Sequence, residues 1–129
     1  MNLHRFLFLT NHRHDAALWL TNMRAPQTKF SVTVANPCTR SIRATRRFDL
    51  IMIDVDNERK AEALELCKSL RKRTLAPILF VTSQVDDEYE VQVYNVGADD
   101  FIVKPIGVEL LQAKLQAWQR WIVPTMIGS

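Results

Sequence analysis

The amino-acid sequence predicts a single α/β domain built on a doubly wound, parallel sheet of five strands. Short apolar runs alternate with segments of helical spacing along all 129 residues, and this alternation is typical of strands joined by right-handed helical crossovers. Several of the runs are continuously apolar, which indicates strands buried on both faces of a parallel sheet. The length fits one domain with one hydrophobic core.

Five apolar runs predict the strands. Residues 6–9, 50–53 and 78–81 read FLFL, LIMI and ILFV, which is the pattern of fully buried strands. Residues 30–34 read FSVTV, and their alternation predicts a more exposed second strand. Residues 101–103, FIV, predict a short fifth strand. With helices between them, the expected strand order is 2-1-3-4-5, the flavodoxin-like arrangement.

Helical signals fill the intervals between these strands. Apolar residues recur at helical spacing over residues 14–24 and 59–73. Between them, Asn36 and Pro37 provide an N-cap and a first-turn proline for a short helix through residue 46.

The fourth expected helix has a signal at each end. Asp87 and Glu90 have the spacing of a capping box, and Gly97 suits the position that follows a helix C-terminus. After a fifth helix, we expect the domain to end near residue 123. We therefore expect one domain over 1–123 and a tail, or the start of a linker, over 124–129.

Composition excludes several classes of protein. With 47% hydrophobic and 24% charged residues, 3 glycines and 5 prolines, the chain is neither collagen-like nor disordered. The first apolar run is too short for a signal peptide, and none approaches the roughly 18–20 residues of a membrane span. Cys38 and Cys67 are too few for a disulfide framework. We therefore expect a cytoplasmic domain that does not bind membranes.

Polar residues at the carboxyl ends of the strands are the candidate functional residues, because ligands of open α/β sheets bind beyond these ends. The expected strands end in Thr10 and Asn11, in Asp54, in Thr82 and in Lys104. Asp54 could serve as a nucleophile or metal ligand, and Lys104 could hold an anion. The two could equally form an ion pair that closes this edge of the sheet. The spacing leaves both interpretations open.

The stretches FDLIMIDVD, APILFVTS and GADDFIVKPI resemble the receiver domain of two-component response regulators, the CheY-like family, and the resemblance spans nearly the whole chain. It implies that Asp54 is the phosphoacceptor position and that Thr82 senses the phosphoryl group. It further implies that Phe101 is the aromatic rotamer switch, that Lys104 contacts phosphoryl oxygens, and that the bond to Pro105 is cis. Such a chain is a signalling domain rather than an enzyme.

The sequence departs from the family pattern at the end of the first strand. The family has two acidic residues there that help to bind Mg²⁺, whereas this chain has Thr10 and Asn11. Asp54 and Lys104 then leave the pocket neutral, where the family pattern gives two negative charges. A neutral pocket holds Mg²⁺ poorly, and the transferring phosphoryl group loses its chief neutralising charge. We therefore predict weak Mg²⁺ binding and weak or absent phosphorylation.

An alternative interpretation keeps the domain active. Asn11 retains an oxygen ligand, and Asp56 lies two residues after Asp54, where its carboxylate could restore negative charge around Mg²⁺. The metal ligands would then be Asn11, Asp54 and Asp56. In this case a histidine kinase or phosphotransfer protein would phosphorylate Asp54.

The last expected helix, residues 108–122, has a broad apolar stripe. Leu111, Leu115 and Trp118 recur at helical spacing, and Trp121 widens the stripe. The resemblance implies that the fourth helix, fifth strand and fifth helix form the face for partners or a homodimer, so these four residues are interface candidates. Alternatively, the tryptophans cover the end of the sheet. An output domain could follow the chain.

Nucleic-acid binding is a third hypothesis, since the chain has a net charge of +3 and two clusters of basic residues. These clusters lack interleaved aromatic residues, and short runs of like charge are common on solvated surfaces, so we expect no such binding. The clusters are Arg40, Arg43, Arg46 and Arg47, and Lys68, Arg71, Lys72 and Arg73.

Overall fold

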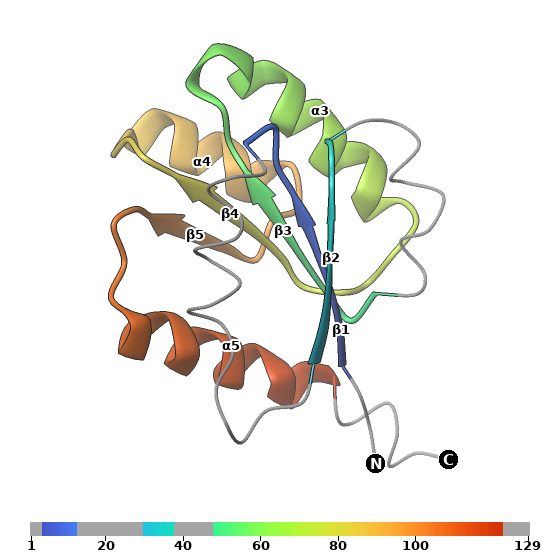
Figure 1. The fold of residues 1–129 in the computed structure, drawn as a ribbon. Helices are drawn as coiled ribbons and strands as arrows, with labels where there is room; N and C mark the ends of the chain where they lie inside the picture. The colour runs from blue at the N-terminus through green and yellow to red at the C-terminus, as the bar shows by residue number, and fades with distance from the viewer. Residues whose placement is uncertain (1–3, 13–29, 38–47, 123–129) are drawn as a thin grey trace.

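Five parallel strands form one sheet in the order β2-β1-β3-β4-β5 (Figure 1). The computed structural model describes residues 4–12, 30–37 and 48–122. The strand order confirms the sequence prediction. The strands are β1 (His4–Leu9), β2 (Phe30–Ala35), β3 (Leu50–Asp54), β4 (Ile78–Thr82) and β5 (Asp100–Val103).

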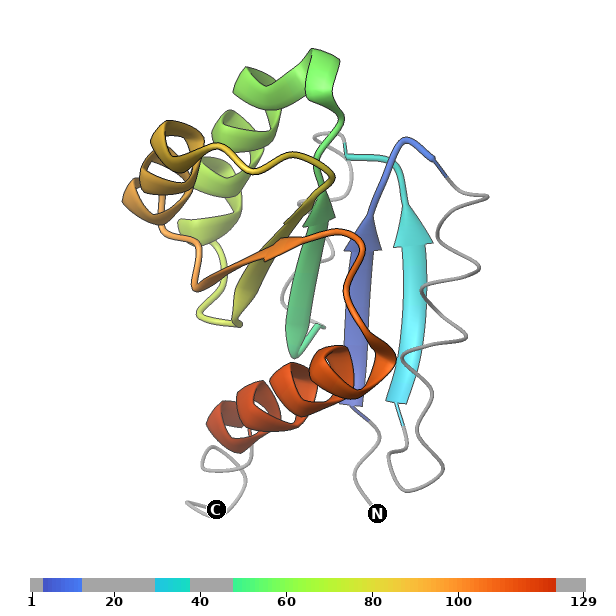
Figure 2. The ribbon, with the colours of Figure 1, turned by 90° about the vertical axis from the view of Figure 1, so that its left-hand side faces the viewer.

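Helices cover both faces of the sheet (Figure 2): α3 and α4 pack on one face and α5 on the other. The described helices are the 3₁₀ turn η2 (Asn57–Arg59), α3 (Lys60–Arg71), α4 (Asp87–Asn95) and α5 (Val108–Ile122). The helices expected over 14–24 and from Pro37 through residue 46, and the expected tail, lie outside the described residues. Within the described part of the chain, no helix is long and apolar enough to span a membrane.

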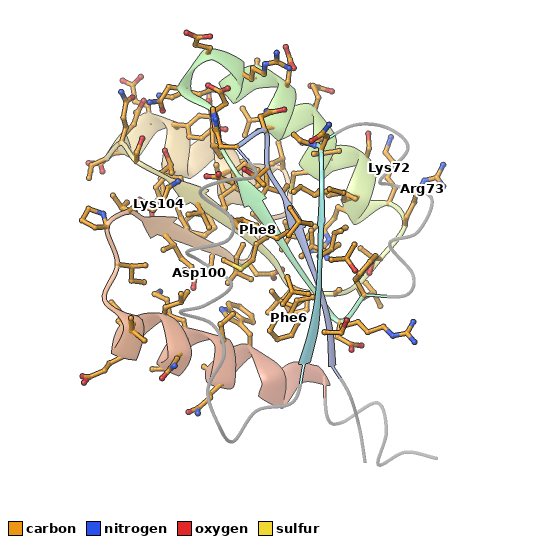
Figure 3. The ribbon with its side chains drawn as sticks, in the orientation of Figure 1. Phe6, Phe8, Lys72, Arg73, Asp100 and Lys104 are labelled. Carbon is orange, nitrogen blue, oxygen red and sulfur yellow. The ribbon has the colours of Figure 1, made fainter. Side chains whose placement is uncertain are left out.

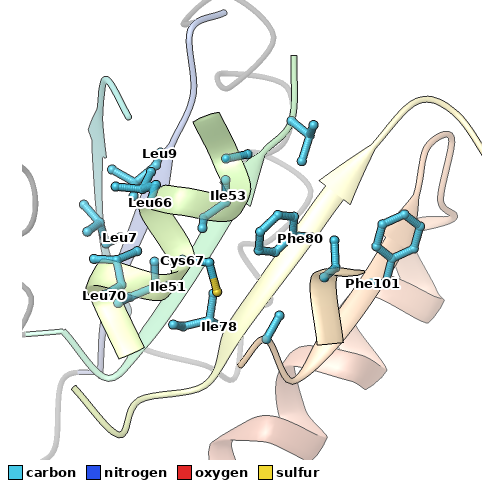
Figure 4. Packing of buried hydrophobic residues seen from close by; sticks show 14 of the residues in the cluster. Leu7, Leu9, Ile51, Ile53, Leu66, Cys67, Leu70, Ile78, Phe80 and Phe101 are labelled. Atoms are coloured by element: carbon cyan, nitrogen blue, oxygen red, sulfur yellow. The ribbon is translucent and has the colours of Figure 1, made fainter. Parts of the chain in front are cut away.

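The two faces of the sheet divide the core into two clusters, because successive strand residues point to opposite faces. Leu7, Ile51 and Phe80 face α3 and α4 (Figure 4). Their strand neighbours Phe8 and Met52 face α5. Every residue of β3 and β4 is buried, which explains why these strands have continuous apolar runs.

Helix α4 begins one residue earlier than the expected capping box requires. Asp86, in extended geometry, is the N-cap, and its carboxylate accepts a hydrogen bond from the Tyr89 backbone N–H at 3.1 Å. This hydrogen bond lowers the pKa of Asp86 from its usual value, and the Lys60 ammonium acts in the same direction. The capping box predicted at Asp87 and Glu90 is therefore wrong, because Asp87 is already helical.

Arg71, near the end of α3, connects three segments at the amino edge of the sheet. Its guanidinium donates to the Gly97 carbonyl at 2.7 Å and to the Asp99 carboxylate at 3.0 Å. It also donates to the carbonyls of Thr74 and Ala76. Arg71 is thus a structural residue rather than part of a basic surface. The other basic cluster, from Arg40 to Arg47, lies outside the described residues.

The position of Gly97 generates the first prediction. Its φ is +104°, as expected for the residue that follows a helix, and an added Cβ would lie 2.7 Å from Cδ of Arg71. Because hydrogen bonds hold Arg71 in place, we expect Gly97→Ala to lower the free energy of unfolding by about 1–3 kcal/mol.

Urea denaturation measures this change. Gly107→Ala is the matched control, because its Cβ would meet nothing within 4 Å; its stability should change by less than about 0.5 kcal/mol. Equal stability of the two variants would contradict the role assigned to Gly97 and Arg71.

Candidate functional site

The carboxylate of Asp54, at the end of β3, lies at the centre of the candidate site. Its side chain is 4% exposed. Oδ1 accepts a hydrogen bond from Lys104 Nζ at 3.0 Å, and Oδ2 accepts one from Thr10 Oγ1 at 2.8 Å. Three strand ends thus meet at one carboxylate, as the topology predicts. Figure 3 labels Lys104. Asp54 and Lys104 form the ion pair that the sequence left as one of two interpretations.

Thr10 orients its hydroxyl toward Asp54. The residue is fully buried, and its Oγ1 accepts a hydrogen bond from the His12 backbone N–H at 2.9 Å. A hydroxyl has one proton, and the geometry directs it to the Asp54 carboxylate. A neutral donor therefore lies where the family pattern has an acidic residue.

Lys104 lies in the loop that follows β5. Its backbone N–H donates to the Thr82 carbonyl at 2.7 Å, and this contact holds the loop beside the end of β4. The peptide bond between Lys104 and Pro105 is cis, as the resemblance implies. The Lys104 side chain is three-quarters buried, so its ion pair with Asp54 is partly protected from solvent.

Thr82 is buried at the end of β4. Its Oγ1 accepts a hydrogen bond from the Gln84 backbone N–H at 3.2 Å. In the described part of the chain no hydrogen bond joins Thr82 to Asp54. The topology places the two residues at the ends of neighbouring strands, while the hydroxyl orders the turn after β4.

Phe101 is buried against the aromatic ring of Tyr89. The two rings meet edge to face with centroids 6.4 Å apart, and Tyr89 makes a similar contact with Phe80 at 6.4 Å. Phe80 and Phe101 are labelled in Figure 4. The Tyr89 hydroxyl donates to the Lys60 carbonyl at 2.9 Å, so Tyr89 connects the Phe101 position to the start of α3. Spacing along the sequence gives no indication of this contact.

Burial also shifts two pKa values in this region. Desolvation raises the pKa of the Tyr89 hydroxyl above its usual value, and the nearby Cys67 acts in the same direction. Desolvation raises the pKa of the Cys67 thiol to about 11, while the positive charge of Arg71 opposes the shift. Both groups therefore stay neutral at neutral pH, which suits their positions in the core.

Asn11 and Asp56, the other two expected metal ligands, are not arranged as ligands of a metal site. Asp56 caps η2, with Oδ1 accepting from the Glu58 backbone N–H at 3.1 Å. Its Oδ2 lies 3.5 Å from His12 Nε2. Asn11 is exposed. The contact of Asp56 with His12 is a feature that sequence analysis missed, because the two residues are far apart in the chain.

A small cleft of about 20 Å³ lies beside Asp54, which is room for roughly one water. Mg²⁺ requires near-octahedral coordination by oxygen atoms. Both oxygens of Asp54 already accept hydrogen bonds, and no group of three acidic, histidine or cysteine side chains could hold a metal within the described residues. The donor set therefore does not fit Mg²⁺. Residues lining the cleft include Asn11, Pro37, Asp54, Asp56, Arg59 and Glu62.

The apolar stripe of α5 faces the sheet. Leu111 and Leu115 are 1% and 2% exposed and belong to the core, so their prediction as interface residues is wrong for this structure. Trp118 is half-buried against the same cluster and donates its indole N–H to the Asp100 carboxylate at 3.3 Å. This arrangement agrees with the alternative that the tryptophan covers the sheet. Trp121 belongs to α5, but its side chain lies outside the description.

These features define a class of protein. A parallel sheet in the order 2-1-3-4-5 with an acid at the end of β3, a hydroxyl at the end of β4 and a lysine directly after β5 is the framework of a receiver-type signalling domain. The family model for the response regulator receiver domain matches residues 13–116. The chain belongs to this family.

Known proteins of this class are similar over part or all of the chain. The transcriptional regulatory protein SpaR of Bacillus subtilis is 40% identical over 73 residues, 57% of this chain and 33% of SpaR. The nisin biosynthesis regulatory protein NisR of Lactococcus lactis is 36% identical over 70 residues, 54% of this chain and 30% of NisR. The similar region is therefore about a third of each of these relatives.

Two solved structures show the same fold. A two-component response regulator from Clostridium difficile has a TM-score of 0.78 and 24% identity, with 91% of this chain and 96% of that chain covered. A response regulator from Thermotoga maritima has a TM-score of 0.78 and 19% identity, with 91% and 98% covered.

The hydrogen bond from Thr10 to Asp54 generates the second prediction. Thr10→Val keeps the shape of the side chain but leaves one buried carboxylate oxygen without its donor. We expect the free energy of unfolding to fall by about 1–3 kcal/mol, the cost of an unsatisfied buried polar group. Urea denaturation at neutral pH measures the change.

Thr33→Val is the matched control, because Thr33 lies on β2 with its side chain exposed. Its stability should change by less than about 0.5 kcal/mol. If the two variants are destabilised equally, the Thr10 hydroxyl does not support Asp54.

Proposed function

We propose that this chain is an atypical receiver domain that acts mainly through protein–protein contacts, with weak or absent Mg²⁺-dependent phosphorylation of Asp54. One observation carries the proposal: both oxygens of the Asp54 carboxylate accept hydrogen bonds from the protein itself, one from Thr10 and one from Lys104. A carboxylate held in this way has a structural role, because it connects the ends of neighbouring segments. Both contacts stabilise the charged form of the carboxylate and hold it in place.

The charge of the site supports the same conclusion. In phosphoryl transfer, a metal ion neutralises the charge that develops on the transferred group. Asp54 is already paired with Lys104, and Thr10 and Asn11 supply no further negative charge. Asp56 directs its oxygens to a backbone N–H and to His12. In this arrangement the negative charges of Asp54 and Asp56 both already have partners, which weakens the attraction of the site for Mg²⁺.

The relatives suggest the setting in which such a domain works. SpaR and NisR are regulatory proteins about three times as long as the region that matches. We infer that the natural setting of this receiver includes an output domain, and that its partners are of the histidine kinase or phosphotransfer type. The contacts with these partners would then report the presence or conformation of the receiver rather than its phosphorylation.

The competing function is an active receiver, and Asp56 is the observation in its favour. Its side chain lines the same cleft as Asp54. To bind a metal, however, Asp56 would have to leave both the cap of η2 and His12. These two proposed functions differ in whether Asp54 accepts a phosphoryl group.

Treatment with acetyl phosphate distinguishes them and is the third prediction. We expect intact-mass spectrometry to show little or no phosphoryl adduct on the wild-type protein, with or without Mg²⁺. The control is Asp54→Asn, and circular dichroism establishes that both proteins are folded. A Mg²⁺-dependent adduct that disappears in Asp54→Asn would show that Asp54 is a working phosphoacceptor and would overturn the proposal.

Restoring the acidic pair is the fourth prediction. Thr10→Asp combined with Asn11→Asp removes the donor to Asp54 and supplies two carboxylates, so Mg²⁺-dependent labelling by acetyl phosphate should increase at least tenfold over the wild type. Asn11→Asp alone tests the exposed position without burying a new charge, and should give a smaller increase.

Addition of Asp54→Asn to the double variant is the control and should abolish the labelling. If the folded double variant is labelled no more than the wild type, the missing acidic residues are not what limits phosphorylation.

A further inference from the structure

An exposed basic surface with an apolar tip lies where α3 ends and the chain turns into β4. We call Lys68, Lys72, Arg73 and Leu75 the basic patch. All four side chains are exposed, and Leu75 is 97% exposed. Figure 3 shows Lys72 and Arg73 extending away from the end of α3. Neither forms an ion pair within the described residues.

The backbone on both sides of Leu75 is held in place. The carbonyls of Thr74 and Ala76 accept hydrogen bonds from Arg71. The Ala76 N–H donates to Thr74 Oγ1 at 3.0 Å, and the Thr74 N–H donates to the Leu70 carbonyl at 3.1 Å. The loop is therefore fixed by hydrogen bonds, and its geometry keeps the Leu75 side chain in solvent.

A second surface has the opposite charge and its own exposed apolar side chains. We call Val85, Asp87, Glu88, Val91 and Tyr94 the acidic patch. On α4, residues 87, 88, 91 and 94 have the spacing of one helix face, whereas the buried residues of this helix face the core. Val85 and Val91 are 77% and 59% exposed. Within the described residues, neither Asp87 nor Glu88 forms an ion pair.

We propose that a second copy of this chain covers these surfaces, with the basic patch of one molecule against the acidic patch of the next. The two patches have opposite charge, and each includes at least one aliphatic side chain whose removal from water is favourable. They lie on different sides of the molecule, with Lys72 and Arg73 at the right of Figure 3 and α4 at the left of the same view in Figure 1. One molecule therefore cannot pair its own patches.

The contact is head-to-tail. It leaves one patch uncovered at each end of a pair, so further copies can add. It differs from a symmetric dimer through α4, β5 and α5, in which each molecule would use the same face. Because neither patch includes Asp54, the proposal is independent of phosphorylation.

The size and composition of the patches set the strength of the association. Rim charges mainly steer and orient partners, while buried apolar groups supply most of the affinity. With one aliphatic side chain in the basic patch and two in the acidic patch, the association is weak. Its charged groups are exposed, so added salt weakens it further.

Two variants that each impair one patch test the proposal, which is the fifth prediction. Arg73→Gln with Leu75→Gln removes one charge and the aliphatic side chain of the basic patch, and Glu88→Gln with Val91→Gln removes one charge and one aliphatic side chain of the acidic patch. In sedimentation velocity, the wild-type mass should rise with protein concentration and fall toward the monomer as salt is added. Each variant alone should remain a monomer. An equimolar mixture should form a 1:1 dimer and nothing larger, because one complementary pair of patches remains.

Leu110→Gln is the matched control, because Leu110 is an exposed apolar residue of α5 outside both patches, and it should associate like the wild type. Circular dichroism shows whether each variant is folded. A wild type that stays monomeric at every concentration would overturn the proposal. A variant that still dimerises alone would indicate a symmetric interface elsewhere, and folded variants whose mixture stays monomeric would show that the patches do not meet. Both results overturn the head-to-tail contact, and neither bears on labelling by acetyl phosphate.

Discussion

The buried carboxylate of Asp54 is the constraint on which the carboxyl edge of this domain depends. A buried charge is costly unless it is paired and hydrogen-bonded. Thr10 and Lys104 meet that requirement, and they come from the ends of β1 and β5. The same two contacts that make the burial of Asp54 acceptable therefore join three segments of the chain.

The position of Phe101 is linked to the helices through Tyr89. The Tyr89 ring lies between Phe80 and Phe101, and its hydroxyl is hydrogen-bonded to the start of α3 at Lys60. A different orientation of Phe101 would change its edge-to-face contact with Tyr89. Phe101, at the aromatic position of the family pattern, is therefore part of the packed core. At the opposite edge, Arg71 joins α3 to the segment before β5.

Membership in the receiver family fixes the framework of this chain, whereas its chemistry depends on individual side chains. The acid, hydroxyl and lysine positions remain at the ends of β3, β4 and β5. At the end of β1, Thr10 provides a hydrogen-bond donor where an acidic residue would provide a metal ligand. The family pattern has acidic residues at the positions of both Thr10 and Asn11, whereas these two residues add no negative charge to the Asp54–Lys104 pair.

The sequence by itself determined the order of the sheet, the fully buried central strands and the meeting of Asp54 with Lys104, because these follow from hydrophobic periodicity and topology. Only the tertiary structure decided where particular side chains point. It directed the Thr10 hydroxyl to Asp54 and the Asp56 carboxylate to His12, and it buried Leu111 of α5 against the sheet. Such contacts join residues that are distant in the chain. Each depends on which neighbours the fold brings together, and spacing along the sequence does not specify these neighbours.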